Sequence, residues 1–305
     1  MASVELDLEL RNDADLVLRD SKGRMVFSPS QLKTWMGCQL QGKYHYVDMI
    51  PDDSAHIKAV FGTCVHEALD WYERGSSVEE ASSRFLLTWE TPTLITSEPN
   101  KFSARGLTYA GLRQKGVEII EEHHEKINTT HDRQLVGSEI PFMLPFGSHI
   151  IRGHIDLIDI MPNMKGVPTL RVIDHKSSSR RPTKIQLALD IQFTSYLYAV
   201  QQKQFWDDFS PELWETVKDM PKVGIWNHLM TGDEIDAGKR GEADFNRMLR
   251  LADSIKLSVD REVYVPTIDH EVCGFCAYKE QCTSVQGLLE VFDDEYPIGD
   301  DGLDF

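Results

Sequence analysis

The sequence predicts an α/β (α+β) fold in which a central sheet is flanked by helices. Two central segments, HIIRGHIDLIDI and LRVIDHK, are rich in Ile, Val and Leu and are separated by MPNMKGVPT. That pattern is typical of a strand, a turn and a second strand. Residues 106–127 and 241–258 instead carry apolar residues at helical spacing. The 305 residues are 41% apolar, which is enough for a sizeable core.

Three more helices follow from local signals. Ser28-Pro29-Ser30-Gln31 combines a capping Ser, a Pro at the first helical position and a Gln three residues after the cap. The segments HIKAVFGTCVHEALDWYERG and KIQLALDIQFTSYLYAV also have helical periodicity. The expected apolar faces are Leu32, Trp35, Met36 and Leu40 in the first helix, Phe61, Val65, Leu69 and Tyr72 in the second, and Ile185, Leu189, Phe193 and Leu197 in the third.

The two ends of the chain differ from its middle. We expect one domain over residues 28–285, a flexible acidic arm over 1–27 and a disordered acidic tail over 286–305. The N-terminus has no continuous apolar stretch typical of a secretion signal, and no window approaches the roughly 20 apolar residues of a membrane helix. These features predict a soluble, cytoplasmic protein without a membrane partner.

Charge and cysteine content narrow the function classes. The net charge of −17 argues against a general nucleic-acid coat protein, because phosphate binding needs local positive charge. An enzyme that lines a groove with basic residues remains compatible with this charge. The five cysteines are an odd number and do not resemble a secreted disulfide framework, so their clustering favours a metal site.

The strand pair carries an arrangement of two acids and one lysine. Asp174 and Lys176 are two residues apart on one strand and should point to the same face. If the turn is centred on Lys165, Asp156 falls nearly opposite Asp174, and cross-strand carboxylates at about 5 Å can share a divalent cation. Carboxylates and a backbone carbonyl suit Mg²⁺ or Mn²⁺. The alternative is an ordinary solvated strand face.

These residues carry a family resemblance. The order G-H-I-D and then I-D-H-K resembles the PD-(D/E)XK nuclease superfamily, whose restriction-endonuclease-like core is a mixed sheet flanked by helices. F-G-T-C-V-H and Q-F-T-S-Y resemble elements of its RecB-like branch. The resemblance implies a catalytic set of Asp156, Asp174, Lys176, His66, Gln192 and Tyr196, with His66, Asp156, Asp174 and the His175 carbonyl as metal ligands. Arg180 and Arg181, in the basic loop SSSRRPTK, are candidates for DNA contact.

Each of these residues also has an ordinary structural interpretation. His66 could pair with Asp70 on an exposed helix face, and Gln192 and Tyr196 could flank a core stripe. Glu139 could be an edge-strand residue or a supporting acid, and we place it outside the metal site. The pair His123 and His124, within EEHHEK, is interpreted as a solvated helix face.

The cysteines raise a question of ligand number. Cys273, Cys276 and Cys282 have C-x2-C-x5-C spacing, and four thiolates suit either a 4Fe–4S cluster or zinc. One subset of the RecB-like branch, which includes the CRISPR adaptation nuclease and AddB-type nucleases, joins such a triplet to an N-terminal cysteine around a 4Fe–4S cluster. Cys38, in SPSQLKTWMGC, resembles that fourth ligand, although Gln39 follows it where proline is usual. Spacing alone leaves zinc open, with His270 in place of Cys38, and Cys64 is expected to be a buried small residue.

Together these features predict a metal-dependent DNA exonuclease that acts on a free end or a single strand in recombination, repair or replication. The alternatives are a DNA-end-binding adaptor or CRISPR adaptation component on the same scaffold, and a nuclease stapled by zinc. The terminal GDDGLDF resembles the tips of bacterial single-stranded-DNA-binding proteins, which suggests a recombination or single-strand-binding partner. The alternative for this tail is a solvated acidic segment.

Overall fold

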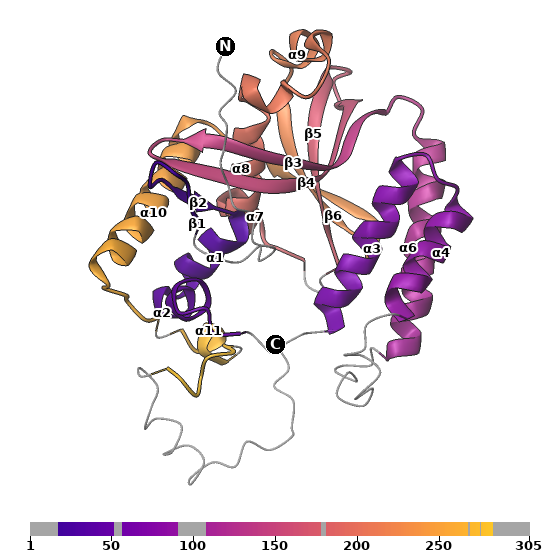
Figure 1. Cartoon of the computed structure of the whole chain (residues 1–305). Helices are drawn as coiled ribbons and strands as arrows, with labels where there is room; N and C mark the ends of the chain where they lie inside the picture. The colour runs from indigo at the N-terminus through magenta and orange to yellow at the C-terminus, as the bar shows by residue number, and fades with distance from the viewer. Residues whose placement is uncertain are drawn as a thin grey trace.

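A mixed sheet forms the centre of the molecule (Figure 1). The computed structural model describes residues 18–51, 57–90, 108–177, 181–267, 269–274 and 276–282. Within them the strands are β1 (Leu18–Arg19), β2 (Met25–Phe27), β3 (Gln134–Phe146), β4 (His149–Pro162), β5 (Pro168–Lys176), β6 (Lys222–His228) and β7 (Asp233–Gly238). The order is β1-β2-β4-β5-β6-β7, with β3 also paired to β4. The β2–β4 and β5–β6 pairs are parallel and the others antiparallel, so the predicted fold class is confirmed.

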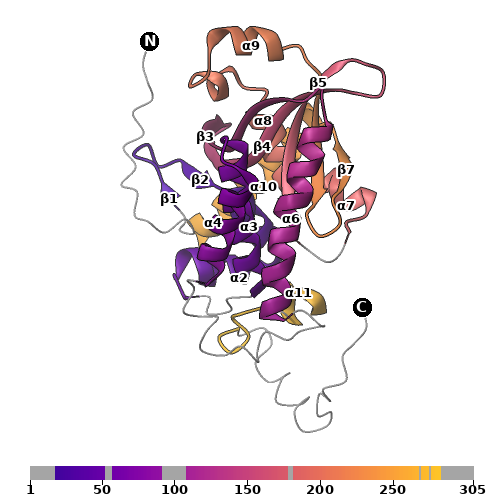
Figure 2. The same ribbon diagram turned by 90° about the vertical axis from the view of Figure 1, so that its right-hand side faces the viewer.

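Helices cover both flanks of this sheet. They are α1 (Pro29–Gly37), α2 (Gln39–Gly42), a π-helix (Lys43–Val47), α3 (Ile57–Glu73), α4 (Val78–Glu90), α6 (Tyr109–Thr129), α7 (Lys184–Leu189), α8 (Ile191–Ala199), a 3₁₀ turn (Lys203–Trp206), α9 (Pro211–Val217), α10 (Glu242–Arg261) and α11 (His270–Gly274). Figures 1 and 2 show α3, α4 and α6 packed together on one flank, with α1, α2 and α10 on the other. No described helix has the length and apolar character needed to cross a bilayer.

The β4–β5 hairpin has the predicted register. Leu157 pairs with Ile173 and Pro162 with Pro168, so the turn is centred on Lys165 and the next position inward sets Asp156 opposite Asp174. The glycine of G-H-I-D has a packing role. A Cβ atom at Gly153 would lie 2.9 Å from the Phe142 ring and 3.6 Å from Pro29. Its absence therefore lets β3 and the start of α1 approach β4 closely.

The first helix begins as predicted and ends earlier. Ser28 and Gln31 form the reciprocal capping box, and Leu32 and Trp35 are buried. Met36, expected on the apolar face, is 57% exposed. The helix stops at Gly37 because Cys38 adopts an extended backbone, so the helical spacing no longer applies beyond that point. Strands β1 and β2 lie within the segment predicted to be an arm, and β2 joins the sheet. Residues 1–17 and the tail from 283 onward lie outside the described residues.

The helix predicted over KIQLALDIQFTSYLYAV is two helices. Asp190 adopts an extended conformation between α7 and α8, and its side chain accepts hydrogen bonds from the backbone N–H groups of Gln192 and Phe193. This N-cap starts a new helix and shifts the apolar face. Ile185 and Leu189 are therefore 64% and 48% exposed, contrary to the prediction. Phe193 and Leu197 are buried as expected.

Candidate active site

The floor of the site is formed where β4 and β5 run side by side. Asp156 lies on β4, and Asp174 and Lys176 share one face of β5. The Lys176 Nζ atom lies 3.0 Å from Asp174 Oδ1 and 2.8 Å from Oδ2. The backbone N–H of His175 donates to Asp156 Oδ2 at 2.7 Å. The two acids and the lysine singled out from the sequence therefore meet at one place.

His66 reaches this floor from α3. Its Nε2 atom donates to the His175 carbonyl at 3.1 Å, and its Nδ1 atom lies 3.6 Å from Asp156 Oδ2. The alternative pairing of His66 with Asp70 is not found, since Asp70 instead accepts hydrogen bonds from Arg74 and Ser138. The imidazole thus lies against the same two groups that the family resemblance implies as metal ligands.

Glu139 belongs to this cluster, although the sequence analysis placed it outside. Its Oε1 atom lies 3.7 Å from His66 Nδ1, and the β3–β4 register sets Glu139 opposite Asp156. The row Glu139, Asp156 and Asp174 thus crosses three adjacent strands. Glu139 also has φ of 45°, in the left-handed region that non-glycine residues seldom adopt. Backbone strain of this kind concentrates at functional sites.

Burial and mutual repulsion tune the charges of the row. Burial, and then the neighbouring Asp174 carboxylate, raise the pKa of Asp156 to about 7. Burial alone would lower the pKa of His66, but its contacts with Glu139 and Asp156 outweigh that effect and raise it. Lys176 behaves in the same way, because Asp174 and Asp156 raise its pKa despite burial. A proton is therefore held within the row near neutral pH when no cation is bound.

The donor set fits a divalent cation. Ligand atoms of His66, Glu139 and Asp156 lie within 4.8 Å of one another. Asp174 is 1% exposed, and its Oδ2 atom lies 2.8 Å from the Lys176 ammonium, which compensates the buried charge. Carboxylates, one imidazole and a backbone carbonyl are ligands that suit Mg²⁺ or Mn²⁺.

The α8 helix covers the same face of the sheet. The Gln192 side chain donates to Asp174 Oδ1 at 2.8 Å and to the Tyr196 hydroxyl at 2.7 Å, and it accepts from Lys176 at 3.2 Å. Burial, followed by the charges of Asp156 and Asp174, raises the pKa of Tyr196 well above its usual value, so the hydroxyl stays protonated. Gln192 contacts the row directly and Tyr196 is joined to it through Gln192, which is more than the alternative of flanking a core stripe.

A groove of about 890 Å³ opens onto this site. Its lining includes Asp156, Gln192 and Tyr196, together with Lys33 and Arg152. Its volume is within the range of pockets that enclose small-molecule ligands. The groove thus brings Lys33 and Arg152 to the same cavity as the acids Asp156 and Asp208.

The basic loop is described only in part. Arg180 lies outside the described residues. Arg181 is more than half exposed and pairs with Asp233. An exposed ion pair of this kind is weak, so Arg181 could exchange Asp233 for a phosphate. Its contact with DNA stays a prediction.

Comparison with known proteins agrees with this geometry. A family model described as PD-(D/E)XK nuclease superfamily matches residues 26–283. The chain belongs to the PD-(D/E)XK nuclease superfamily. The curated proteins contain no match. Among solved structures, SSO0001 is similar with 11% identity over 85% of this chain and 86% of its own, at a TM-score of 0.35. A candidate exonuclease from Eubacterium rectale is similar with 14% identity over 89% and 93%, at a TM-score of 0.40.

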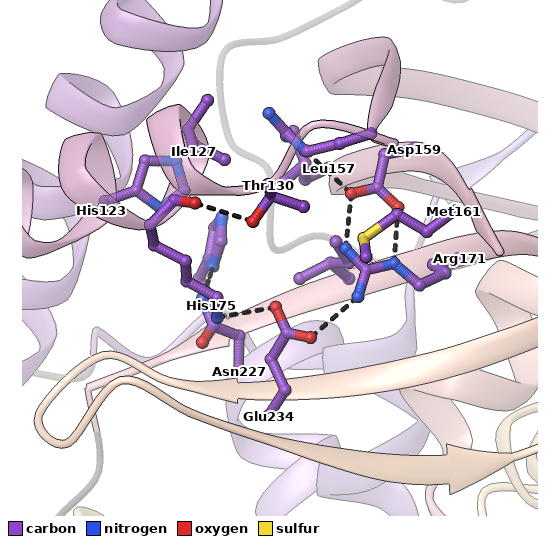
Figure 3. Close-up of a pocket in the computed structure, with 13 residues that line it drawn as sticks. His123, Ile127, Thr130, Leu157, Asp159, Met161, Arg171, His175, Asn227 and Glu234 are labelled. Atoms are coloured by element: carbon purple, nitrogen blue, oxygen red, sulfur yellow. Dashed lines mark hydrogen bonds and ion pairs between the residues drawn. The ribbon is translucent and has the colours of Figure 1, made fainter. Parts of the chain in front are cut away.

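The opposite face of the superfamily core carries a separate network of buried charges (Figure 3). Asp159, fully buried on β4, accepts from Arg133 at 2.9 Å and from Arg171 at 2.7 Å. Arg133 also pairs with Glu73 of α3, and Arg171 with Glu234 of β7, each at 2.8 Å. A cavity of about 70 Å³ lies among these residues. Arg133 bonds to Glu73 on α3 and to Asp159 on β4, so the network links α3, which carries His66, to the sheet.

His123 belongs to this network, which corrects the expectation of a solvated helix face. Its side chain is only 8% exposed, and its Nε2 atom lies 2.8 Å from Glu73 Oε1. Asn227, on β6, donates to the Nδ1 atom of His175 on the adjacent strand β5 at 2.8 Å. Burial lowers the pKa of His175 well below its usual value. The His175 ring thus stays neutral behind the sheet, while its backbone bonds to His66 and Asp156 on the other face.

The four candidate cysteines come together from both ends of the domain. Cys38 follows the last turn of α1 and lines one small pocket with Cys273, Cys276 and Cys282. None of the four forms a disulfide bond. Backbone N–H groups donate to two of the sulfurs, from Thr267 to Cys38 at 3.5 Å and from Tyr278 to Cys276 at 3.4 Å. Hydrogen bonds of this type are typical of metal-bound thiolates.

Polar contacts hold the two segments together around the cysteines. The Gln39 backbone N–H donates to the Val265 carbonyl at 3.2 Å, and Val265 N–H donates back to the Gln39 side chain at 2.9 Å. Proline at position 39 could not donate that backbone bond, so Gln39 has a local role in joining the two segments. Tyr44 also donates to the Gln281 carbonyl at 3.1 Å. The fifth cysteine, Cys64, is buried in a separate apolar cluster, as expected.

The raised pKa of Asp156 predicts an unusual dependence of stability on pH. Because the folded protein holds this proton to about pH 7 and an unperturbed Asp releases it near 3.8, the metal-free protein should lose stability as pH rises between those values. We expect Asp156→Asn to raise the free energy of unfolding by about 2 kcal/mol at pH 8 and to have little effect at pH 4. Urea unfolding in EDTA measures this, with exposed Asp132→Asn as control. Equal effects at both pH values would contradict the assignment.

Proposed function

We propose that this chain is a metal-dependent DNA exonuclease that processes DNA ends in recombination, repair or replication. The observation that carries the proposal is the acidic row of Glu139, Asp156 and Asp174, with Lys176 beside it. Asp156 connects this row to a groove that Lys33 and Arg152 also line. Membership of a nuclease superfamily supports phosphodiester hydrolysis. The choice of exonuclease, and the place in DNA metabolism, come from the resemblance of its motifs to the RecB-like branch.

The ligands of a Mg²⁺ or Mn²⁺ ion would be His66, Asp156, Asp174 and the His175 carbonyl, and the structure adds Glu139 to this set. Such an ion, when bound, lowers the pKa of a coordinated water and polarises the phosphate. The row would exchange its shared proton for the ion, because ligands must be deprotonated to bind a metal.

Lys176 acts as a cation in this proposal. Since nearby carboxylates raise its pKa, it stays protonated at neutral pH and can donate to the attacking water or to a phosphate oxygen. Gln192 donates both to Asp174 and to the Tyr196 hydroxyl, so the pair would orient the strand beside the reacting phosphate. An adaptor that only binds DNA ends would not need this complete set.

We also propose that the four cysteines hold a 4Fe–4S cluster that clasps residues 28–285 into one domain. Cys38, Cys273, Cys276 and Cys282 line one small pocket, and four thiolates suit either a 4Fe–4S cluster or zinc. The resemblance of their order and spacing to the iron–sulfur subset of the RecB-like branch favours the cluster over zinc. The alternative with His270 as a zinc ligand rests on a side chain outside the described part.

The experiment that tests the activity is digestion of linear DNA in Mn²⁺, with each substrate labelled at one end and blocked at the other. An exonuclease should release labelled nucleotides from one unblocked end and leave circular single strands intact. Cleavage of circles as fast as linear DNA would replace the proposal with an endonuclease. Binding to DNA ends without hydrolysis would favour the adaptor. Pull-down of single-strand-binding proteins with full-length protein and with a chain lacking 286–305 tests the acidic tail.

A further inference from the structure

A lysine from the N-terminal helix reaches into the catalytic hydrogen-bond network. Lys33, on α1, donates from Nζ to Gln192 Oε1 at 3.1 Å and pairs with Asp190 Oδ2 at 3.0 Å. Its side chain is 37% exposed and lines the groove that opens onto the acidic row. The motifs that resemble the superfamily assign no role to Lys33, and its role follows from its contacts.

The first contact fixes the direction of the Gln192 amide. Gln192 Oε1 accepts from two ammonium groups, those of Lys33 and Lys176, while its Nε2 atom donates to Asp174 and Tyr196. A flipped amide would point its N–H groups at both cations and its oxygen at the Asp174 carboxylate. Charge-assisted hydrogen bonds are stronger than neutral ones. Lys33 therefore stabilises the one orientation in which Gln192 can hold both Asp174 and Lys176.

The second contact fixes the start of α8. Asp190 caps this helix through the N–H groups of Gln192 and Phe193, and the break after α7 leaves no continuous helix to hold it from the other side. A cation bonded to the capping carboxylate ties α8 to α1 at the residue where its orientation is set. The two contacts of Lys33 thus act on the same short segment, the one that carries Gln192.

We propose that Lys33 is a positioning residue for DNA hydrolysis, which acts through Gln192 on Asp174 and Lys176. The inference rests on the proposed nuclease function and deepens it, because it assigns a role to a residue outside the acid–acid–lysine set. The competing role is direct contact with a DNA phosphate, since Lys33 also lines the groove. The two roles differ in which kinetic constant they affect.

Steady-state kinetics on linear DNA separate these roles. Lys33→Met should lower kcat about tenfold and leave KM within about twofold, because the lost bonds orient groups that act in the transition state. Lys33→Arg, which keeps a charged donor, should recover most of the rate. In a Gln192→Ala background, Lys33→Met should have less than about a twofold further effect. Lys256→Met removes an equally exposed lysine from an ion pair on α10 and should change neither constant.

Two kinetic results would overturn the proposal. A raised KM with unchanged kcat would make Lys33 a phosphate contact, and independent effects of Lys33→Met and Gln192→Ala would show that it does not act through Gln192. A readout that needs no activity is the side-chain amide NMR signal of Gln192 in protein labelled with ¹⁵N-glutamine, assigned by its loss in Gln192→Ala. Lys33→Met should shift that signal and speed its exchange with water. An unchanged signal would refute positioning, whereas inactive wild-type protein would refute only the nuclease proposal.

Discussion

Asp174→Asn should reduce DNA hydrolysis in Mg²⁺ or Mn²⁺ by at least about a thousandfold, equivalent to about 4 kcal/mol of transition-state stabilisation. Asp174 is buried, its Oδ1 atom accepts from Lys176 and Gln192, and its Oδ2 atom lies 2.8 Å from Lys176 Nζ. Asparagine has the same shape but lacks the charge that a cation requires. The measurement is the rate of nucleotide release from linear DNA at saturating Mn²⁺, together with calorimetric titration of Mn²⁺.

Two controls make this result specific to the charge. Asp132→Asn makes the same chemical change at an exposed turn and should leave the rate unchanged. Anisotropy with labelled DNA in Ca²⁺ should show that Asp174→Asn still binds DNA within a few fold of wild type. Hydrolysis by Asp174→Asn within tenfold of the wild-type rate would remove Asp174 from the catalytic set, whatever its effect on stability.

The part of this site that could be predicted from the sequence is the part set by local geometry. Alternation along a strand places Asp174 and Lys176 on one face, and the symmetric turn around Lys165 places Asp156 opposite Asp174. The Ser28 capping box likewise depends only on residues within one helical turn. In each case the informative residues are close in sequence, so periodicity and turn chemistry were sufficient.

Features that depend on distant pairing could not be predicted. Glu139 reaches the row only because β3 pairs with β4 in one register and adopts a positive φ at that residue, and neither property has a local signal. His123 looked solvated within EEHHEK, yet Glu73 of another helix partners it behind the sheet. For the helix break at Asp190 there was a local signal, an Asp followed by an apolar run, but unbroken periodicity on both sides obscured it.

The cysteine site and the acidic row are connected through one short helix. Lys33 and Cys38 lie at the middle and just past the end of α1, so the segment that contacts Gln192 also provides the N-terminal cysteine. If the cysteines hold the proposed cluster, its loss should weaken both the contact between the two ends of the domain and the position of α8. We therefore expect loss of the cluster to lower the rate of the proposed hydrolysis.

Cys38→Ala should consequently yield a protein that lacks the brown colour of an iron–sulfur cluster and is less stable by about 5 kcal/mol. That value is the loop-closure contribution of a cross-link from residue 38 to residue 273. Iron and sulfide analysis, together with thermal unfolding under anaerobic conditions, measure both effects.

Cys64→Ala, at a cysteine buried in a separate cluster, is the matched control and should retain the colour. A colourless wild-type protein with one zinc per chain would instead support a metal site that joins the two segments, and would reject the iron–sulfur cluster. The Cys38 side chain accepts a single weak hydrogen bond among the described contacts, from the Thr267 N–H group, so a large loss of stability would have to come from a lost ligand. Full colour and unchanged stability in Cys38→Ala would reject Cys38 as a ligand.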